Sequence, residues 1–213
     1  MTINSFQELI PKIEKTVLPG IESQFKMAPI MRKKLGKDFD FKSRNPKKAA
    51  VMALLYPNIK GDLQMIFMLR KTYKGVHSNQ IGFPGGKIEN EDSSILATAF
   101  RETEEEIGVK RKQIQVLKEL TQVYIPPSNF LVQPYIGLLH EKPKYILDEK
   151  EVEKLIEVPL SDVLSDDSLS VMNIETSYSK EVEVPIFKFN EEVVWGATAM
   201  MLSEIKDLLL IAE

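Results

Sequence analysis

The most informative segment of the chain is FPGGKIENEDSSILATAFRETEEEIGV, from Phe83 to Val109. It opens with a Pro-Gly-Gly turn and a polar loop, and apolar side chains then recur at the spacing of one helical face. Gly108 follows the last of them, at the position where a helix commonly ends. The stretch therefore predicts a glycine-rich loop followed by a helix. The residues expected on its core side are Ile95, Leu96, Ala99, Thr103 and Ile107.

Three glutamates lie on the other side of this helix. Glu102, Glu105 and Glu106 are spaced i, i+3 and i+4, so their carboxylates share one side. A solvated acidic surface is the simpler interpretation. However, like charges at these spacings destabilise a helix by about 0.2–0.5 kcal/mol per pair. The cluster also lies at the negative end of the helix dipole, where an exposed acidic charge costs roughly 0.3–1 kcal/mol. Because several acidic residues that locally destabilise the helix occur together, they indicate a functional site.

Clustered carboxylates without cysteine or histidine partners are the oxygen ligands that Mg²⁺ or Mn²⁺ prefers. Magnesium usually bridges to substrate phosphates, so the cluster predicts phosphoryl or pyrophosphate chemistry. Arg101 precedes Glu105 by one helical turn and can orient it through a charge-assisted hydrogen bond. Gly85 and Gly86 carry no Cβ, which lets the backbone approach a metal and its ligand closely.

These residues resemble the signature of the Nudix hydrolases, a glycine-started loop and a helix containing R-E-x-x-E-E-x-G. Residues 101–108 match that end residue by residue, and Gly86 matches its opening. The loop acidic position, usually Glu, is best matched by Asp92. The spacing from Asp92 to Arg101 is one residue longer than in the common form, and this longer spacing is characteristic of the coenzyme A diphosphatase branch.

A second motif resembles the same branch. HSNQIGFPGG, from His77 to Gly86, is similar to H-x-G-Q-x-x-F-P-G-G, with Asn79 in place of a glycine. Segments 128–137, 150–160 and 195–199 are also similar, and the resemblance covers roughly residues 49–210. It implies hydrolysis of the pyrophosphate bond of coenzyme A or acyl-CoA, with Mg²⁺ or Mn²⁺, to 3′,5′-ADP and (acyl-)4′-phosphopantetheine.

The resemblance also implies roles for residues. Glu102 and Glu106 would be metal ligands, and Glu105 either a ligand or the general base. The Gly86 carbonyl would be a further ligand. A base from outside the helix is an alternative, for which Glu151 is the candidate, although a solvated charge is an equal interpretation. Further candidates for substrate binding are His77, Arg70 and Lys87, each with a structural alternative, and Ser128 and Asn129, which are expected to line the substrate loop after two prolines.

Composition limits the alternatives. The chain has 213 residues, 28 Lys plus Arg, 31 Asp plus Glu, a net charge of −3 and no cysteine. The charge argues against general nucleic-acid binding, and the absence of cysteine excludes disulfide scaffolds and thiolate sites. No apolar run reaches the ~18 residues of a membrane span. The N-terminus does not read as a secretory signal, so we expect a cytoplasmic location.

One mixed α/β domain is the simplest account of the chain, because strands and helices alternate without a linker. The resemblance makes it a Nudix fold, an α/β/α sandwich around a mixed sheet. We expect a Nudix domain at 48–213, and an N-terminal helical arm with a basic connection at 1–47 packed on it. The basic stretch 31–48 reads as a solvated connection or, alternatively, as a loop near an anionic ligand.

Further elements follow from periodicity. Paired strands are predicted at 49–56 and 63–70, and other strands at 114–124, 132–139, 170–176 and 182–189. A short helix is expected after Pro159, and a C-terminal helix with Trp195 in its apolar stripe. Met65, Met68, Met200 and Met201 read as core residues.

Three alternatives in function stay open at this stage. One is a sister activity on ADP-ribose, a dinucleotide polyphosphate or a damaged nucleoside triphosphate. Another is a catalytically silent module that senses nucleotides. The third is an α/β protein with an acidic surface. No nucleic-acid or membrane partner is expected, and a homodimer is left open.

Overall fold

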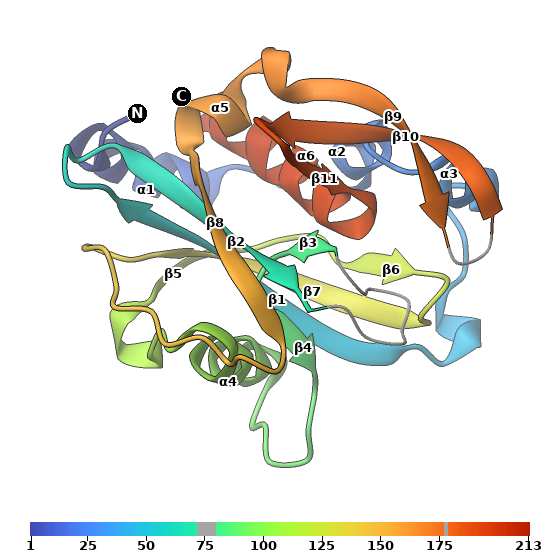
Figure 1. Ribbon diagram of the computed structural model, residues 1–213, viewed down its shortest axis with the longest axis horizontal. Coiled ribbons are helices and arrows are strands. Elements are labelled where there is room, and N and C mark those ends of the chain that lie inside the picture. Colours follow the sequence, from blue (N-terminus) through green and yellow to red (C-terminus); the bar gives the residue numbers. More distant parts are fainter. Residues whose placement is uncertain (72–79, 177–178) are drawn as a thin grey trace.

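The computed structural model describes residues 1–71, 80–176 and 179–213 (Figure 1). The helices are α1 (Ile3–Lys15), α2 (Gly20–Lys26), α3 (Ile30–Leu35), α4 (Ile95–Ile107), α5 (Leu160–Leu164) and α6 (Gly196–Ala212). Short 3₁₀ turns are η1 (Lys42–Arg44), η2 (Arg111–Gln113) and η3 (Asp166–Ser168). The strands are β1 (Lys47–Pro57), β2 (Leu63–Arg70), β3 (Ile81–Gly82), β4 (Gly85–Lys87), β5 (Gln115–Glu119), β6 (Val123–Ile125), β7 (Phe130–Leu138), β8 (Val152–Pro159), β9 (Leu169–Thr176), β10 (Ser179–Phe189) and β11 (Glu192–Trp195).

The main sheet is mixed and is built around β1. Its principal order is β3-β2-β1-β7-β5, while β4 pairs with β1, β6 with β7, and β8 with β2. β1 runs parallel to β7 and antiparallel to β2 and β4. A second, three-stranded antiparallel sheet has the order β11-β10-β9. The expected mixed sheet is therefore confirmed.

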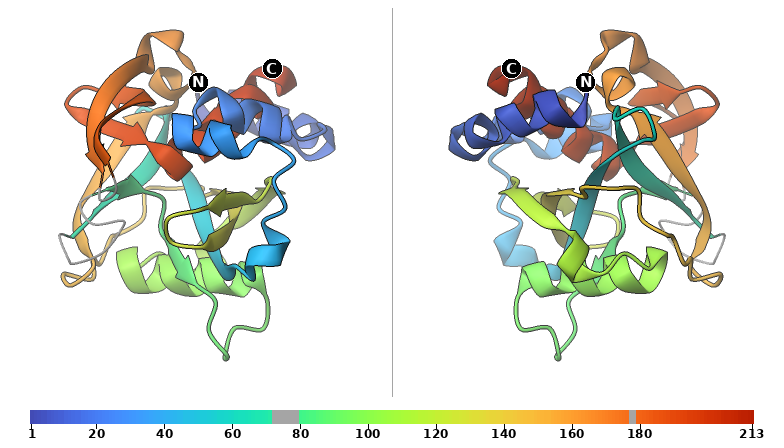
Figure 2. Two further views of the ribbon diagram at one scale, coloured as in Figure 1. Left: turned by 90° about the vertical axis from the view of Figure 1, so that its right-hand side faces the viewer. Right: turned by 90° about the vertical axis from the view of Figure 1, so that its left-hand side faces the viewer.

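β1 is buried on both faces, which makes it the centre of two cores. Ala53 and Leu55 belong to the core beneath the N-terminal and C-terminal helices, whereas Met52 and Leu54 belong to the core beneath α4. Because side chains alternate along a strand, one apolar run supplies both. Figures 1 and 2 show α4 on one side of the sheet and α1, α2 and α6 on the other. This is the α/β/α sandwich expected from the resemblance.

α4 ends at Gly108 as its sequence predicts, and Ser94 caps its start. The Ser94 hydroxyl accepts a hydrogen bond from the Ala97 N–H at 3.1 Å, which caps the first turn. Gly108 adopts the left-handed conformation, with φ of 76°, and its N–H donates to the Glu104 carbonyl at 2.9 Å. Ala99 and Ile107 are fully buried against the sheet. The helix is therefore fixed at both ends and along one face, which orients its glutamates.

The N-terminal arm packs on the main domain through α1 and α2. α1 is continuous across Pro11, and Phe6 and Ile13 are completely buried in the core that includes α6. A proline inside a helix removes one backbone hydrogen bond, and here burial of the apolar face offsets this loss. The basic stretch 31–48 is not all connection, since it contains α3, η1 and the start of β1.

Several elements differ from the prediction. The expected strand 114–124 is two strands, β5 and β6, both paired with β7. Glu119 pairs with Tyr135 and Val123 with Val132, so the segment between β5 and β6 is one residue longer than the part of β7 opposite it. Trp195 ends β11, and α6 begins only at Gly196, so its placement in a helical stripe was wrong. The short helix after Pro159 and the burial of the four methionines are confirmed. No helix within the described residues is long and apolar enough to cross a membrane.

Candidate functional site

The ends of four strands, β1, β2, β7 and β8, meet at one end of the main sheet. β1 and β7 both start there, with Lys47 paired to Phe130, while antiparallel β2 ends there at Arg70. β8 starts beside it, since Val152 pairs with Arg70. The segment from β3 to β4 lies between β2 and β1, because β3 pairs with the first and β4 with the second. The glycine loop is therefore central in this group.

The two glycines of this loop are required by close contacts. Gly85 has φ of +151°, and a Cβ on it would lie 2.2 Å from the Ala50 carbonyl oxygen. A Cβ on Gly86 would lie 2.5 Å from the Glu102 carboxyl group. Such distances are shorter than any van der Waals contact, so a side chain at either position would displace the strand or the carboxylate. The loop and the helix are thus in contact at Glu102.

Glu106 is the most buried carboxylate of the cluster. Its side chain is 2% exposed, its Oε2 accepts the Gly85 N–H at 2.7 Å, and its Oε1 lies 3.1 Å from Arg70 Nη1. Oε1 is nevertheless buried without a hydrogen bond of acceptable geometry. Burial raises the pKa of Glu106 to about 8, although the charge of Arg70 and the Gly85 N–H act in the opposite direction. The folded chain therefore holds an acid that is expensive to ionise.

Arg101 joins the loop to the helix. Its Nε and Nη2 donate to the two oxygens of Asp92, each at 3.0 Å, and Nη2 also donates to the Lys87 carbonyl. Its Nη1 donates to Glu105 Oε2 at 2.9 Å and lies 3.0 Å from Glu102 Oε1. The predicted contact between Arg101 and Glu105 is therefore present, but it is one of several.

Asp92 serves this junction and does not face the other carboxylates as a free group. Its side chain is 4% exposed and also accepts hydrogen bonds from the Thr98 hydroxyl and the Glu89 N–H, both at 2.9 Å. The hydrogen bonds from Arg101 hold the pKa of Asp92 near 2, below its ordinary 3.8. Sequence reasoning found Asp92 as a motif position but missed this pairing. The two residues are nine positions apart in sequence, and this spacing predicts a contact only once the loop between them is known to fold back onto the helix.

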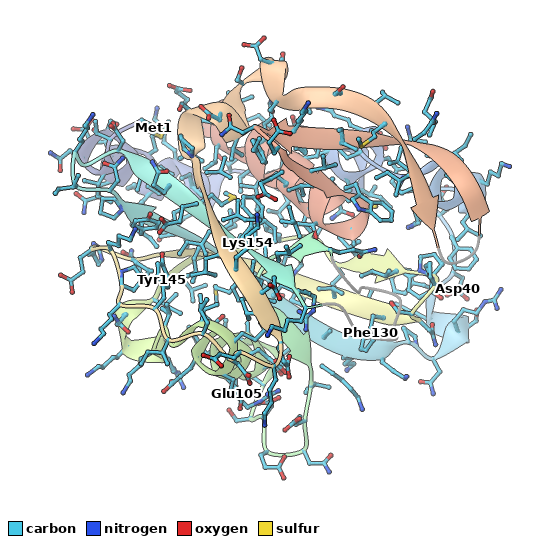
Figure 3. The ribbon with its side chains drawn as sticks, viewed as in Figure 1. Met1, Asp40, Glu105, Phe130, Tyr145 and Lys154 are labelled. Atoms are coloured by element: carbon cyan, nitrogen blue, oxygen red, sulfur yellow. The ribbon has the colours of Figure 1, made fainter. Side chains whose placement is uncertain are left out.

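Glu102 and Glu105 differ in environment. Glu102 is 14% exposed, and burial raises its pKa while Arg101 lowers it. Glu105 is 57% exposed on the outer side of α4 (Figure 3). Burial disfavours the ionised form of a carboxylate unless a cation lies next to it. A bound metal ion would therefore stabilise the buried Glu102 and Glu106 more than the exposed Glu105.

Glu151 is brought to the same site by Arg70. Arg70 Nη2 lies 3.5 Å from Glu151 Oε2, while its Nη1 contacts Glu106. The Lys71 N–H also donates to the Glu151 carbonyl at 2.8 Å. Glu151 is 53% exposed, so its carboxylate reaches solvent at the rim of the site. Arg70 thus links a buried and an exposed carboxylate from distant parts of the chain, a link that sequence reasoning missed.

The residues fit a hard divalent cation. Within the described ranges, no three His, Asp or Glu side chains are already arranged to hold a metal ion. Arginines lie against the carboxylates, Arg70 on Glu106 and Arg101 on Glu102 and Glu105. Glu106 Oε1 is buried and has an ion pair with Arg70 but no hydrogen bond, and the absence of a Cβ at Gly86 lets the backbone lie against the Glu102 carboxyl group. Oxygen donors of this kind suit Mg²⁺ or Mn²⁺.

The other substrate-binding candidates have different surroundings. His77 lies outside the described residues. Lys87 is exposed beside the loop, and Ser128 is half-buried. Asn129, with φ of 52°, uses its side chain within the fold: Oδ1 accepts from the Tyr124 hydroxyl at 3.0 Å, and Nδ2 donates to the Arg44 carbonyl at 3.1 Å. Asn129 therefore shapes its loop, and a role in binding substrate stays a prediction.

Comparison with known proteins agrees with this geometry. A family model described as the NUDIX domain matches residues 46–171. An uncharacterized Nudix hydrolase, NudL, of Photorhabdus laumondii is 31% identical over 163 residues, which are 76% of this chain and 85% of that protein. The peroxisomal coenzyme A diphosphatase ndx-8 of Caenorhabditis elegans is 30% identical over 166 residues, 77% of this chain and 69% of that one.

Solved structures agree in fold. The NUDIX domain of Shewanella oneidensis NrtR, determined in complex with ADP ribose, superposes with a TM-score of 0.53 at 15% identity, covering 83% of this chain and 97% of that one. The glycine loop, the capped helix with its three glutamates and the family match thus coincide in one segment of sequence. With more than half of its length matched by the NUDIX model, this chain belongs to the Nudix hydrolase family.

Proposed function

We propose that this protein hydrolyses the diphosphate of coenzyme A or an acyl-CoA, with Mg²⁺ or Mn²⁺, to 3′,5′-ADP and (acyl-)4′-phosphopantetheine. The observation that carries the proposal is the buried carboxylate of Glu106, whose Oε1 lacks a hydrogen bond next to the Gly85-Gly86 turn. A buried carboxylate oxygen without a hydrogen bond costs stability even beside an arginine, and a substrate-bound cation would relieve that cost. The similarity to a coenzyme A diphosphatase supports the substrate class.

Each residue of the site receives a specific role. Glu106, Glu102 and the Gly86 carbonyl would hold the metal, with Glu105 as a further ligand or as the base. The metal would neutralise the diphosphate and lower the pKa of the attacking water. Arg101 would keep Glu102 and Glu105 in place, because its guanidinium contacts both. Removing this contact should therefore disturb both carboxylates together.

A proton must leave the attacking water, and two carboxylates are placed to accept it. Glu105 is the exposed member of the helix cluster, and Glu151 is held near Glu106 through Arg70. A base has to come within about 2.6–3.2 Å of the water. Glu105→Gln and Glu151→Gln variants separate the two roles, since loss of the base lowers kcat at saturating metal whereas loss of a ligand raises the metal concentration required.

The proposal is tested by product identification. Purified protein with Mg²⁺ or Mn²⁺ is incubated with coenzyme A, ADP-ribose, NADH and diadenosine polyphosphates, and the products are identified by mass. We expect coenzyme A to yield 3′,5′-ADP, EDTA to stop the reaction and Mn²⁺ to restore it. Preferred cleavage of ADP-ribose would move the chain to the sister activity, and cleavage of none would favour a silent sensor module.

Matched variants complete the test. Glu106→Gln should retain the fold and lose most metal-dependent turnover, whereas Glu104→Gln, on the exposed side of the same helix, should behave as the parent. Full activity of Glu106→Gln would contradict the metal assignment.

For location, we propose the cytoplasm. The named relatives include a peroxisomal protein, so imaging of a tagged chain is the direct measurement. Sedimentation would establish whether the protein is a homodimer.

A further inference from the structure

Three basic residues before and at the start of β1 have no part in the site described above. Arg44, in η1, and Lys47 and Lys48 are all exposed. In the described part of the chain, no carboxylate lies within ion-pair distance of any of them. The chain as a whole has a net charge of −3, so this basic segment, Arg44, Lys47 and Lys48, is a local exception suited to an anion.

The basic segment is held in place by the loop before β7. The Lys47 N–H donates to the Asn129 carbonyl at 2.9 Å, and the Asn129 side-chain amide donates to the Arg44 carbonyl at 3.1 Å. The Tyr124 hydroxyl in turn donates to Asn129 Oδ1 at 3.0 Å. Figure 3 shows Asp40 and Phe130 at this end of the molecule, on the same side as the tips of β6 and β7. The position of the basic segment is thus set by backbone and side-chain contacts.

Aromatic rings support two of the cations. The Arg44 guanidinium lies 6.0 Å from the centroid of Phe39, and Lys47 Nζ lies 5.7 Å from the centroid of Phe130. Phe39 itself stacks on Tyr124, with centroids 5.9 Å apart. A cation held over a ring has lost part of its rotamer freedom before a ligand arrives. The side chains of Arg44 and Lys47 are therefore partly ordered.

The basic segment adjoins the glycine loop. Ala50 pairs with Gly86, and the Ile88 N–H donates to the Lys48 carbonyl at 3.1 Å. Lys48 precedes Ala50 by two residues, so its side chain lies on the same face of the strand, the face that packs against α4. The displacement along the strand is about 7 Å at roughly 3.3 Å per residue. A phosphate one sugar ring away from the bound diphosphate would be within reach.

Lys47 points to the opposite face of β1 from Lys48. We propose that the basic segment, through Arg44 and Lys48, binds a phosphate monoester on the nucleoside part of the substrate, separate from the diphosphate that is cleaved. This inference rests on the proposed function and specifies its substrate: a nucleoside 3′-phosphate 5′-diphosphate ester, as in coenzyme A. A phosphate monoester offers acceptor oxygens and a charge of nearly two, which a guanidinium and an ammonium complement. ADP-ribose and unmodified dinucleoside polyphosphates lack the group, so the segment would select against them.

The kinetic test compares coenzyme A with 3′-dephospho-coenzyme A. The variant is Arg44→Gln/Lys48→Gln, and the matched control is Lys33→Gln/Lys34→Gln, which removes the same charge from exposed positions in α3. We expect the variant to raise KM for coenzyme A by about tenfold, the loss of one or two charged hydrogen bonds, with kcat unchanged. The dephosphorylated substrate should show no change, and the control should match the parent on both substrates.

Equilibrium binding provides a readout that does not require turnover. Calorimetry with adenosine 3′,5′-bisphosphate and with AMP should show that the double variant loses affinity only for the bisphosphate. An equal loss of affinity for the bisphosphate and for AMP, or an unchanged affinity for the bisphosphate, would overturn the inference. If coenzyme A is not cleaved at all, the proposed function fails, and the calorimetric comparison still decides whether the basic segment binds the phosphate. Should the double variant not fold, Lys48→Gln alone is measured in the same way.

Discussion

The buried acid at Glu106 should make the stability of the metal-free protein depend on pH. Its pKa is about 8 in the folded chain, against an ordinary 4.5, chiefly because burial disfavours the charged form. Between these values the folded state binds more protons at this site than the unfolded state, so stability falls as pH rises through the window. The difference corresponds to up to about 5 kcal/mol at 1.36 kcal/mol per pH unit.

The assay is urea unfolding of EDTA-treated protein between about pH 5 and about pH 9. Glu106→Gln cannot ionise, so the parent should lose stability relative to this variant as pH rises, and the difference should level off above about pH 8. Glu104→Gln changes the same charge on the exposed side of α4 and should follow the parent. Saturating Mg²⁺ should reduce the pH dependence of the parent, since a bound cation stabilises the ionised form.

Parallel stability curves for the parent and Glu106→Gln would refute this reasoning. They would mean that the carboxylate ionises in the folded state as easily as in water, and that Arg70 and the Gly85 N–H fully offset its burial. A pH dependence that Mg²⁺ does not change would also count against a metal at this carboxylate, whatever the catalytic activity of the variant.

Two further predictions concern the loop. In Gly86→Ala, the new Cβ would lie 2.5 Å from the Glu102 carboxyl group. We expect turnover to fall by more than about tenfold and stability by about 1–3 kcal/mol. The control is Gly36→Ala: its Cβ meets nothing within 4 Å, and although a φ of +78° is strained for alanine and should lower stability, activity should be kept. Normal activity of Gly86→Ala would show that Glu102 can move without loss. In Asp92→Asn, the paired hydrogen bonds from Arg101 weaken; a pKa near 2 against 3.8 corresponds to about 2 kcal/mol of stability at neutral pH. Because the pKa is lowered, this difference from the parent should disappear as pH falls through about 2, and unfolding curves that remain apart in acid would contradict it.

Much of the local structure could be predicted from the sequence because it depends on neighbours along the chain. The cap at Ser94, the stop at Gly108 and the buried side of α4 follow from residue types at fixed offsets. The same dependence on local pattern led to the wrong placement of Trp195 in the C-terminal helix. Its apolar spacing continues that of α6, but pairing of β11 with β10 places it at the end of a strand. Pairing with a distant strand is not visible in a local pattern.

The loop, the helix, the cluster of Glu102, Glu105 and Glu106, its contact with Arg101 and the family signature could all be predicted from sequence, since they lie within one continuous segment. That a distant cation, Arg70, also meets the cluster is visible only in the folded chain. Arg70 reaches Glu106 and Glu151 because β2 ends, and β8 begins, beside the glycine loop. Burial also depends on the whole fold, so the contrast between buried Glu106 and exposed Glu105 arises only once α4 packs on β1. Desolvation and long-range pairing are properties of the assembled chain, which is why sequence offsets could place the carboxylates but not rank them.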